Sequence, residues 1–395
     1  MARTGGPGTE DRMGPAAGDW HPGSIAVVGL GLLGASLAEA ARKRRPSVRI
    51  TAVSSPATLE KARAAGLADA AFGYSGIDEA VADADLVVLC TPINRIKATL
   101  EAWALRPPPC KPGCIITDVG STKAEICALG RKAFPAIHSR SGAPASGAVF
   151  IGSHPMAGSE KTGLEARDPL LFQNASWVIC AEDGQSEAAD RLEAFARSLG
   201  ARTTRMLAEL HDKVAAHVSH LPQLLSTALA SYIGERKTVV DNCLQIAGGG
   251  FRDMTRLAAS SFTVWEPILR SNLAAVREAT AGFREHLAAV EAGLEWDLAA
   301  DFFKEGNRLR AQLSISRKGF ALPLAEILVD LEDKPGALVK VFAPLADAGL
   351  NVLDVEILKV REGEGGVLMM GFAKSEEAAA AIECLTVAGF RARVR

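Results

Sequence analysis

Residues 24–34 read Ser-Ile-Ala-Val-Val-Gly-Leu-Gly-Leu-Leu-Gly, a short apolar run followed by three glycines in G-x-G-x-x-G spacing. Residues 25–28 have the composition of a buried parallel strand, and the alanine-rich stretch after the glycines favours a helix. Gly29 permits a tight turn, Gly31 lets a pyrophosphate approach the backbone, and Gly34 allows close packing of helix on strand. The helix N-terminus then offers unpaired N–H groups to the phosphates. The pattern predicts a dinucleotide site at Gly29, Leu30, Gly31, Leu32, Leu33 and Gly34.

The second predicted strand, residues 48–53, bears on the choice of cofactor because it ends in Ser54-Ser55-Pro56. A site that prefers NAD usually has Asp or Glu here, about 20 residues past the glycines, to bind the ribose 2′-hydroxyl. Without that carboxylate a 2′-phosphate meets no repulsion, and a serine hydroxyl can bond to it. Ser54 is therefore a candidate cofactor contact, and the sequence leaves both NAD and NADP open.

Four further stretches have the apolar character of strands, namely residues 85–90, 115–119, 149–158 and 176–180. In a doubly wound sheet the carboxyl ends of the parallel strands line the crevice that holds the nucleotide. Thr91, Pro92 and Ser121 follow such ends and are candidate cofactor contacts. We expect an α/β Rossmann-type doubly wound sheet over residues 23–184, with 176–180 as its last strand. A disordered leader, rich in glycine and proline, is expected at residues 1–22.

The remainder of the chain changes character twice. Residues 185–318 are rich in Ala, Leu, Glu and Arg with a helical apolar period, which predicts an all-α domain. Its stretch 270–313 has enough apolar surface for a dimer seam, although burial in a core explains the pattern equally well. Residues 325–395 alternate strand and helix signals in the order βαββαβ, which predicts a small α+β domain.

Composition narrows the classes of partner. The formal net charge of −2 argues against a nucleic acid or a membrane surface as the main partner, and no apolar run reaches the ~18 residues that span a bilayer. The seven cysteines are scattered, which is typical of free thiols in the cytoplasm. His217 and His220 are i, i+3 neighbours on a predicted helix, but no third ligand motif accompanies them, so we predict no metal site.

Five motifs stand in a fixed order between residues 24 and 315, beyond the glycine loop. They are DVGSTK at 118–123, HPMAGSEKTG at 154–163, HD at 211–212, SHLP at 219–222 and GGGFRDMTR at 248–256, with Trp265 nine residues later. Together they resemble the prephenate dehydrogenase family, which acts in tyrosine biosynthesis. Residues 325–395 resemble an ACT domain, a small-ligand sensor, and DKPGAL at 333–338 matches the loop where such domains commonly bind an amino acid.

The resemblance implies oxidative decarboxylation of prephenate to 4-hydroxyphenylpyruvate, with hydride passing to NAD or NADP. It implies that His154 accepts the proton of the ring hydroxyl, since a neutral imidazole suits that role, and that Ser121 shares the hydrogen bond. Arg256 would pair with a substrate carboxylate. The other implied substrate contacts are Glu160, His220, Gln223 and Asp253. The implied effector contacts, with tyrosine as the expected effector, are Asp333, Lys334, Gly336, Ala337 and Leu338.

One departure from the family pattern leaves the substrate open. Many prephenate-using relatives have a second histidine in Ser-His-Leu-Pro-His, and this chain has Gln223 there. Glutamine forms hydrogen bonds but carries no positive charge. An arogenate dehydrogenase is therefore an alternative, as is a regulatory binding protein without catalysis. Retention of His154, Ser121 and Arg256 argues against the latter. The resemblance also implies a homodimer.

Overall fold

The computed structural model describes residues 20–135, 147–158, 161–294, 298–314, 324–361 and 365–395. Two compact units are present, Met1–Ala289 and Val290–Arg395. Most of the predicted leader lies outside the described residues, and so does Glu160. In the described part of the chain no helix is both long and apolar enough to cross a membrane. All seven cysteines are free thiols.

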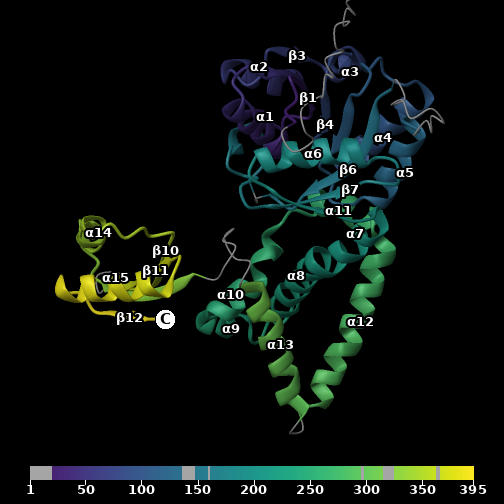
Figure 1. Ribbon diagram of the computed structural model, residues 1–395. Helices are drawn as coiled ribbons and strands as arrows, with labels where there is room; N and C mark the ends of the chain where they lie inside the picture. The colour runs from purple at the N-terminus through teal and green to yellow at the C-terminus, as the bar shows by residue number, and fades with distance from the viewer. Residues whose placement is uncertain (1–19, 136–146, 159–160, 295–297, 315–323, 362–364) are drawn as a thin grey trace, which may run out of the picture. The chain divides into compact units, whose positions relative to one another are not determined.

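The first unit contains an eight-stranded sheet in the order β3-β2-β1-β4-β5-β6-β7-β8 (Figure 1). Strands β1 to β6 pair in parallel, which confirms the doubly wound α/β prediction. The bounds are β1 (Ser24–Val28), β2 (Arg49–Val53), β3 (Ala70–Phe72), β4 (Leu86–Leu89), β5 (Ile115–Asp118), β6 (Val149–Pro155), β7 (Ser176–Cys180) and β8 (Arg202–Arg205).

The expectation that residues 176–180 form the last strand is wrong. β7 runs antiparallel to β6, and β8 pairs parallel to β7 beyond it. The sequence of β8, Arg-Thr-Thr-Arg, shows no apolar alternation because three of its four residues are exposed at the sheet edge. The helix before it, α6 (Ser186–Ser198), belongs to the sheet as well, since Leu192 and Phe195 lie in the sheet core.

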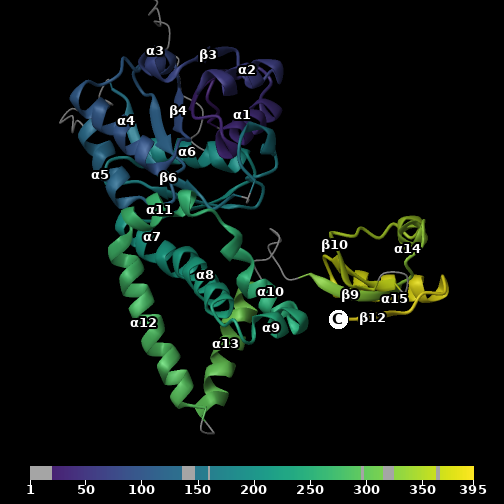
Figure 2. The same ribbon diagram turned by 180° about the vertical axis from the view of Figure 1, so that it is seen from behind.

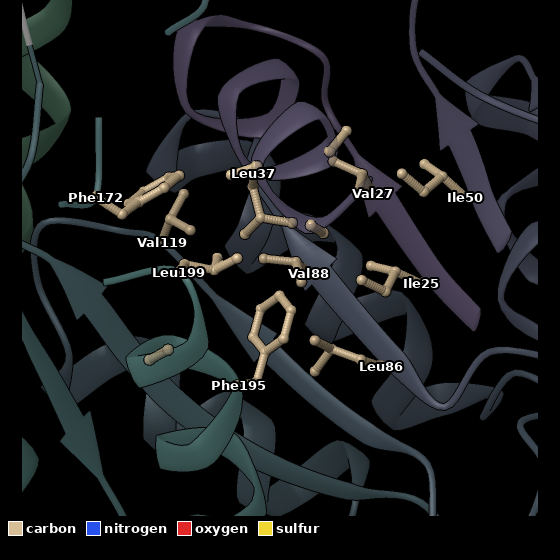
Figure 3. Close-up of a cluster of buried hydrophobic side chains, with 14 of the residues drawn as sticks. Ile25, Val27, Leu37, Ile50, Leu86, Val88, Val119, Phe172, Phe195 and Leu199 are labelled. Atoms are coloured by element: carbon tan, nitrogen blue, oxygen red, sulfur yellow. The ribbon is translucent and has the colours of Figure 1, made fainter. Parts of the chain in front are cut away.

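Helices cover both faces of the sheet. One core joins β1 to α1 (Leu32–Arg44), α2 (Pro56–Ala64) and α6, and Figure 3 shows Ile25 and Val27 facing Leu37 and Phe195 there. The other core joins the opposite face to α3 (Ile77–Val81), α4 (Ile93–Leu105) and α5 (Ala124–Ala133). With both faces buried, the central strands read as continuous apolar runs.

The chain order reverses between β1 and β4, and the crevice for a nucleotide opens at this point. Gly29 ends β1 with φ +101°, a conformation that favours glycine. A Cβ at Gly34 would lie 2.0 Å from the carbonyl oxygen of Gly29, so only glycine lets α1 begin this close to β1. The two glycines therefore fix the helix N-terminus at the switch point.

The helical part of the first unit begins with α7 (Ala208–Ala215), continues through a π-helical turn (Ala216–His220) and extends into α8 (Leu221–Gly234). Ala208 of α7 and Ile268 of α11 (Phe262–Ser271) pack into the sheet core, and α8 runs away from the sheet (Figures 1 and 2). A 3₁₀ turn (Arg256–Ala259) follows α10 and packs on α8. The first unit also contains α9 (Val240–Ile246), α10 (Gly249–Thr255) and most of α12 (Leu273–Ala292), whereas α13 (Leu298–Ser314) belongs to the second unit.

The second unit contains the predicted βαββαβ arrangement. Its strands form an antiparallel sheet in the order β10-β11-β9-β12, and α14 and α15 contribute Val341 and Leu385 to a shared core. The bounds are β9 (Ala325–Leu331), α14 (Ala337–Asp347), β10 (Asp354–Arg361), β11 (Gly365–Phe372), α15 (Ser375–Val387) and β12 (Ala392–Val394).

Candidate active site

A cavity of about 330 Å³ lies at the switch point, where a doubly wound sheet binds its nucleotide. Thr91, which lines it, has a buried hydroxyl without a hydrogen-bond partner in the described structure. A Cβ placed on Gly31 would meet nothing within 4 Å, which leaves room for a pyrophosphate beside the backbone. Of the predicted cofactor residues, those that line the cavity are Gly29, Leu30, Gly31, Ser54, Thr91 and Pro92. Leu32, Leu33, Gly34 and Ser121 do not line it.

A chain of hydrogen bonds leads away from His154, which lies at the C-terminal end of β6 and is buried. Its Nδ1 is 2.9 Å from Nε2 of His211 on α7, and Nδ1 of His211 is 2.8 Å from Oδ1 of Asp212. Asp212 in turn accepts hydrogen bonds from the backbone N–H groups of Lys123 and Ala124, at 2.7 and 2.9 Å. The carboxylate therefore sits at the N-terminus of α5, where the helix dipole stabilises negative charge.

The direction of these bonds fixes the tautomer of His154. Because the Asp212 carboxylate only accepts, His211 must donate from Nδ1, and its neutral form then presents a lone pair at Nε2. His154 donates to that lone pair from its own Nδ1. Its Nε2 is thereby left as an acceptor, which is the form needed to take a proton from a substrate hydroxyl.

Electrostatics keep His154 neutral. Burial first, and then the nearby Lys123 ammonium and two histidines, hold the pKa of His154 well below its usual value of 6.5. Lys123 is fully buried: its Nζ pairs with the Asp118 carboxylate and donates to the Ser153 carbonyl at 2.8 Å. Both partners of this ion pair form hydrogen bonds with the backbone of Ser153, the residue before His154.

His220 is a second buried histidine of the candidate site and lies at the end of the π-helical turn. Asn272 donates to the backbone oxygen of Asp212 at 2.7 Å and lies 3.3 Å from His220 Nδ1. The Trp265 ring packs edge-on against His220, with 6.0 Å between ring centroids. Burial lowers the pKa of His220 to about 4. Local π-helix of this kind is frequent at functional sites.

The segment that carries Arg256 is tied to α8. Gln223 is buried and donates to the Leu257 carbonyl at 2.9 Å, and the Ala258 N–H donates to the Ser226 hydroxyl at 3.0 Å. Arg256 and Asp253 are themselves exposed. Gln223 therefore anchors the 3₁₀ turn, and its Oε1 is buried without a hydrogen-bond partner in the described structure.

The structure places the other predicted residues as follows. Ser121 is half-buried in the loop between β5 and α5. In the second unit, Gly336 precedes α14 with φ +82°, Lys334 pairs with Glu332 at 3.0 Å, and Leu338 is exposed on the first turn. Ala337 donates its N–H to the Lys334 carbonyl at 3.1 Å.

The described residues contain no group of three or more His, Cys, Asp or Glu side chains that could hold a metal ion.

Comparisons with known proteins decide the family. Residues 37–205 match the family model of the prephenate dehydrogenase nucleotide-binding domain, 207–306 that of the prephenate dehydrogenase dimerization domain, and 325–383 that of the ACT domain. A prephenate dehydrogenase of Lactococcus lactis is 30% identical over 360 residues, which cover 89% of this chain and 94% of the relative. The chain belongs to the prephenate dehydrogenase family. Like its relatives it is an NAD(P)-dependent oxidoreductase.

Other relatives span most of the chain. A prephenate dehydrogenase of Bacillus subtilis is 27% identical and covers 92% of the chain and 95% of the relative. A cyclohexadienyl dehydrogenase of Zymomonas mobilis is 31% identical over 73% of the chain and 95% of the relative. Among solved structures, the arogenate dehydrogenase of Synechocystis has a TM-score of 0.60 at 28% identity, over 73% of this chain and 99% of the other. The Aquifex aeolicus prephenate dehydrogenase with hydroxyphenyl propionate and NAD+ shares the fold, with a TM-score of 0.63 at 24% identity over 73% and 98%.

Sequence reasoning assigned no role to four residues that organise the site. His211 and Asp212 form the hydrogen-bond chain behind His154, Asn272 joins that chain to His220, and Lys123 lies buried beneath it. Their signals were the HD and DVGSTK motifs, which showed family resemblance but did not reveal which side chains meet. Asn272 lies in no motif, and only the packing of the helices identifies it.

The buried histidines predict a pH-dependent stability. The folded pKa of His220, about 4, lies below the unfolded value of ~6.5, so between these values the unfolded chain binds more protons. Stability is therefore present above about pH 6.5 and is lost as the pH falls toward 4, by about 1.4 kcal/mol per pH unit for each such group. Urea unfolding of wild type and His220→Asn at about pH 7 and pH 5 measures this, and the variant should show the smaller decrease. Equal decreases would contradict the assignment.

Proposed function

We propose that this enzyme catalyses the oxidative decarboxylation of prephenate to 4-hydroxyphenylpyruvate. The observation that carries the proposal is the His154–His211–Asp212 chain, which presents a neutral His154 with an accepting Nε2 at the carboxyl end of β6. The family relatives that are named prephenate dehydrogenases support the choice of substrate.

The chemistry needs an acceptor for one proton. Loss of CO2 from C1 of the substrate ring sends an electron pair across the ring, and the C4 hydrogen leaves with its bonding pair as hydride. A bound NAD or NADP supplies the hydride acceptor. His154 accepts a hydrogen bond from the C4 hydroxyl and takes up its proton as the C4–O bond gains double-bond character. It returns the proton to the phenol oxygen when the ring becomes aromatic. Ser121 is proposed to share this hydrogen bond.

His220, Arg256 and Asp253 are proposed to hold the substrate. A neutral His220 accepts at Nδ1 from Asn272 and so carries its proton on Nε2, which can donate to a carboxylate or keto oxygen. The guanidinium of Arg256 suits a carboxylate because it offers two parallel donors. Glu160 remains a predicted contact outside the described residues.

The proposal is tested by turnover of the purified full-length enzyme with prephenate and with arogenate, each with NAD and with NADP. Formation of reduced nicotinamide with prephenate supports it. Turnover with arogenate alone would replace it by arogenate dehydrogenation, for which the amide at Gln223 gives a reason. No turnover in any of the four combinations would contradict both enzyme hypotheses and favour a regulatory binding protein without catalysis.

Arg256→Ala is expected to raise the KM for prephenate by about tenfold to a hundredfold, since a hydrogen bond to a charged group contributes about 1.5–3 kcal/mol. Steady-state kinetics measure the change. Arg252→Ala is the matched control, because Arg252 lies one turn earlier, is exposed and donates a hydrogen bond to the Ala247 carbonyl. An unchanged KM in Arg256→Ala would remove this residue from the substrate site.

The ACT domain is proposed to bind tyrosine at the loop before α14 and thereby to regulate the enzyme. Gly336 has φ +82°, so Gly336→Ala strains the loop by about 1 kcal/mol and should weaken tyrosine binding. Gly389→Ala is the matched control, with φ +87° in the same domain but away from this loop. Calorimetric titration with tyrosine should show weaker binding for Gly336→Ala only. If Gly336→Ala and Gly389→Ala bind tyrosine with equal affinity, the effector does not bind at the loop before α14.

A homodimer through the helical region is proposed as well. Residues 207–306 match the family model described as the dimerization domain. On α7 and the turn after it, Leu210, Val214 and Val218 are exposed at i, i+4 and i+8, so they share one helix face.

A further inference from the structure

The loop between β5 and α5 carries Ser121, and the residues around Ser121 are held by hydrogen bonds. Gly120 donates its N–H to Oδ2 of Asp118 at 2.8 Å. Lys123 donates its N–H to the Asp212 carboxylate at 2.7 Å. The Ser121 hydroxyl itself is bonded to none of the described residues, so it is available to a ligand. The loop therefore fixes its backbone on both sides of a hydroxyl that has no partner within the described structure.

A pair of hydroxyls ties the same loop to the helical part of the first unit. Thr122 is buried, and its hydroxyl oxygen lies 2.8 Å from that of Ser271, the last residue of α11. Ser271 in turn donates to the Ile268 carbonyl at 3.0 Å. Because a hydroxyl has one proton, Ser271 must accept the proton of Thr122, and this arrangement satisfies both donors. The neighbour of Ser121 is thus bonded to a residue 149 positions away in the chain.

The junction of α11 and α12 also holds the other side of the site. Asn272, directly after Ser271, donates to the backbone oxygen of Asp212 at 2.7 Å. Asp212 orients the histidine chain that ends at His154. The two residues proposed to meet the substrate hydroxyl, Ser121 and His154, are therefore placed relative to each other by one short segment of the helical region.

The loss of the Ser271 hydroxyl has a definite consequence for this loop. The Thr122 proton would be left without its acceptor in a buried position, which is unfavourable, so the Thr122 side chain would reorient. Ser121 shares a peptide bond with Thr122 and would move with it. A hydrogen-bond donor contributes most to a reaction when its position is fixed beforehand, so a displaced Ser121 would bind the ring hydroxyl less well.

We propose that Ser271 is a positioning residue for Ser121 and acts through the hydroxyl of Thr122. The inference rests on the proposed function, since it concerns how that site holds Ser121 against the ring hydroxyl of the substrate. It gives the helical region a part in orienting a group that belongs to the nucleotide-binding region.

The direct test is calorimetric titration of the full-length protein with 4-hydroxyphenylpyruvate and with phenylpyruvate, which differ only in the ring hydroxyl. The wild type should prefer the hydroxylated ligand. Ser271→Ala should reduce that preference by about twofold to tenfold, as the loss of one neutral hydrogen bond does, and leave phenylpyruvate unaffected. Ser271→Thr keeps the hydroxyl and should restore the preference.

Ser231→Ala is the matched control for Ser271→Ala. Ser231 is exposed on α8, and its hydroxyl likewise donates to the carbonyl three residues earlier, that of Ala228. Ser231→Ala should bind both ligands as the wild type does. A change in this control equal to that in Ser271→Ala would overturn the proposal, because it would trace the effect to the helix and not to Thr122.

A double-mutant cycle separates positioning from a purely structural role. Ser121→Ala should reduce the preference for the hydroxylated ligand, and adding Ser271→Ala should reduce it no further, because the group that Ser271 positions is gone. An equal effect of Ser271→Ala with and without the Ser121 hydroxyl would overturn the proposal. Equal weakening of both ligands in Ser271→Ala, or equal binding of both by the wild type, would overturn it as well.

Turnover distinguishes this inference from the proposed function. Prephenate turnover by the wild type, together with an unchanged ligand preference in Ser271→Ala, would contradict the inference and leave the function intact. Absence of prephenate turnover, together with loss of the ligand preference in Ser271→Ala, would contradict the function and leave the inference intact.

Discussion

His154→Asn is expected to lower kcat for prephenate by about 10²–10⁴-fold, with KM close to that of the wild type. Asparagine can still form a hydrogen bond with the substrate hydroxyl, so the ground-state complex is retained. Asparagine cannot take up a proton. The variant therefore loses stabilisation of the transition state only, in which the substrate hydroxyl becomes acidic. Steady-state kinetics across a range of prephenate concentrations separate the two parameters.

His217→Asn is the matched control for this substitution. His217 lies on the same helical run as His211, but it is exposed and its Nδ1 is bonded to the Lys213 carbonyl. The kcat and KM of His217→Asn should stay at wild-type values. If His154→Asn also kept the wild-type kcat, His154 would not be the proton acceptor, whatever its position.

His211→Phe is expected to lower kcat by about a hundredfold. Phenylalanine fills the volume of the imidazole but offers no acceptor to Nδ1 of His154. The His154 ring is then free to carry its proton on Nε2, the tautomer that cannot accept the substrate proton, so part of the ~10²–10⁴-fold contribution of the base is lost. His211 acts through His154, and it is therefore a positioning residue.

A structural role for His211 would give a different set of results. His211→Gln retains an amide oxygen that can accept from His154, and it should recover part of kcat relative to His211→Phe. Asp212→Asn should lower kcat in the same direction, because a neutral amide oxygen accepts the hydrogen bond from His211 Nδ1 less strongly than a carboxylate does. Equal rates in His211→Phe and His211→Gln would show that volume, and not hydrogen bonding, matters at this position.

The sequence predicts most of the architecture because most of its elements have a local signal. The glycine spacing after Ile25–Val28, the buried strands and the βαββαβ alternation correspond to β1, α1 and the second unit as the structure shows them. β8 has no such signal because it lies at the sheet edge, where Arg202 and Arg205 face solvent and no apolar alternation is needed. Edge strands of this kind depend on pairing with a neighbour, which a single stretch of sequence does not reveal.

The sequence predicts which residues belong to the candidate site, but it does not predict which of their side chains contact one another. His154 and His220 were selected from motifs, but the bond between His154 and His211 joins residues 57 positions apart on a strand and a helix. The resemblance predicts Gln223 as a substrate contact. In the structure its amide nitrogen donates to the Leu257 carbonyl, 34 residues away, and so ties α8 to the segment that carries Arg256. Such contacts follow from packing, not from the pattern of either segment alone.

The most direct test of the mechanism uses prephenate that carries deuterium at C4. If hydride leaves C4 while His154 takes the hydroxyl proton, mass spectrometry should find the deuterium in the reduced nicotinamide, with one CO2 released for each cofactor reduced. Deuterium retained in 4-hydroxyphenylpyruvate or released to water, or CO2 formed without cofactor reduction, would contradict the account.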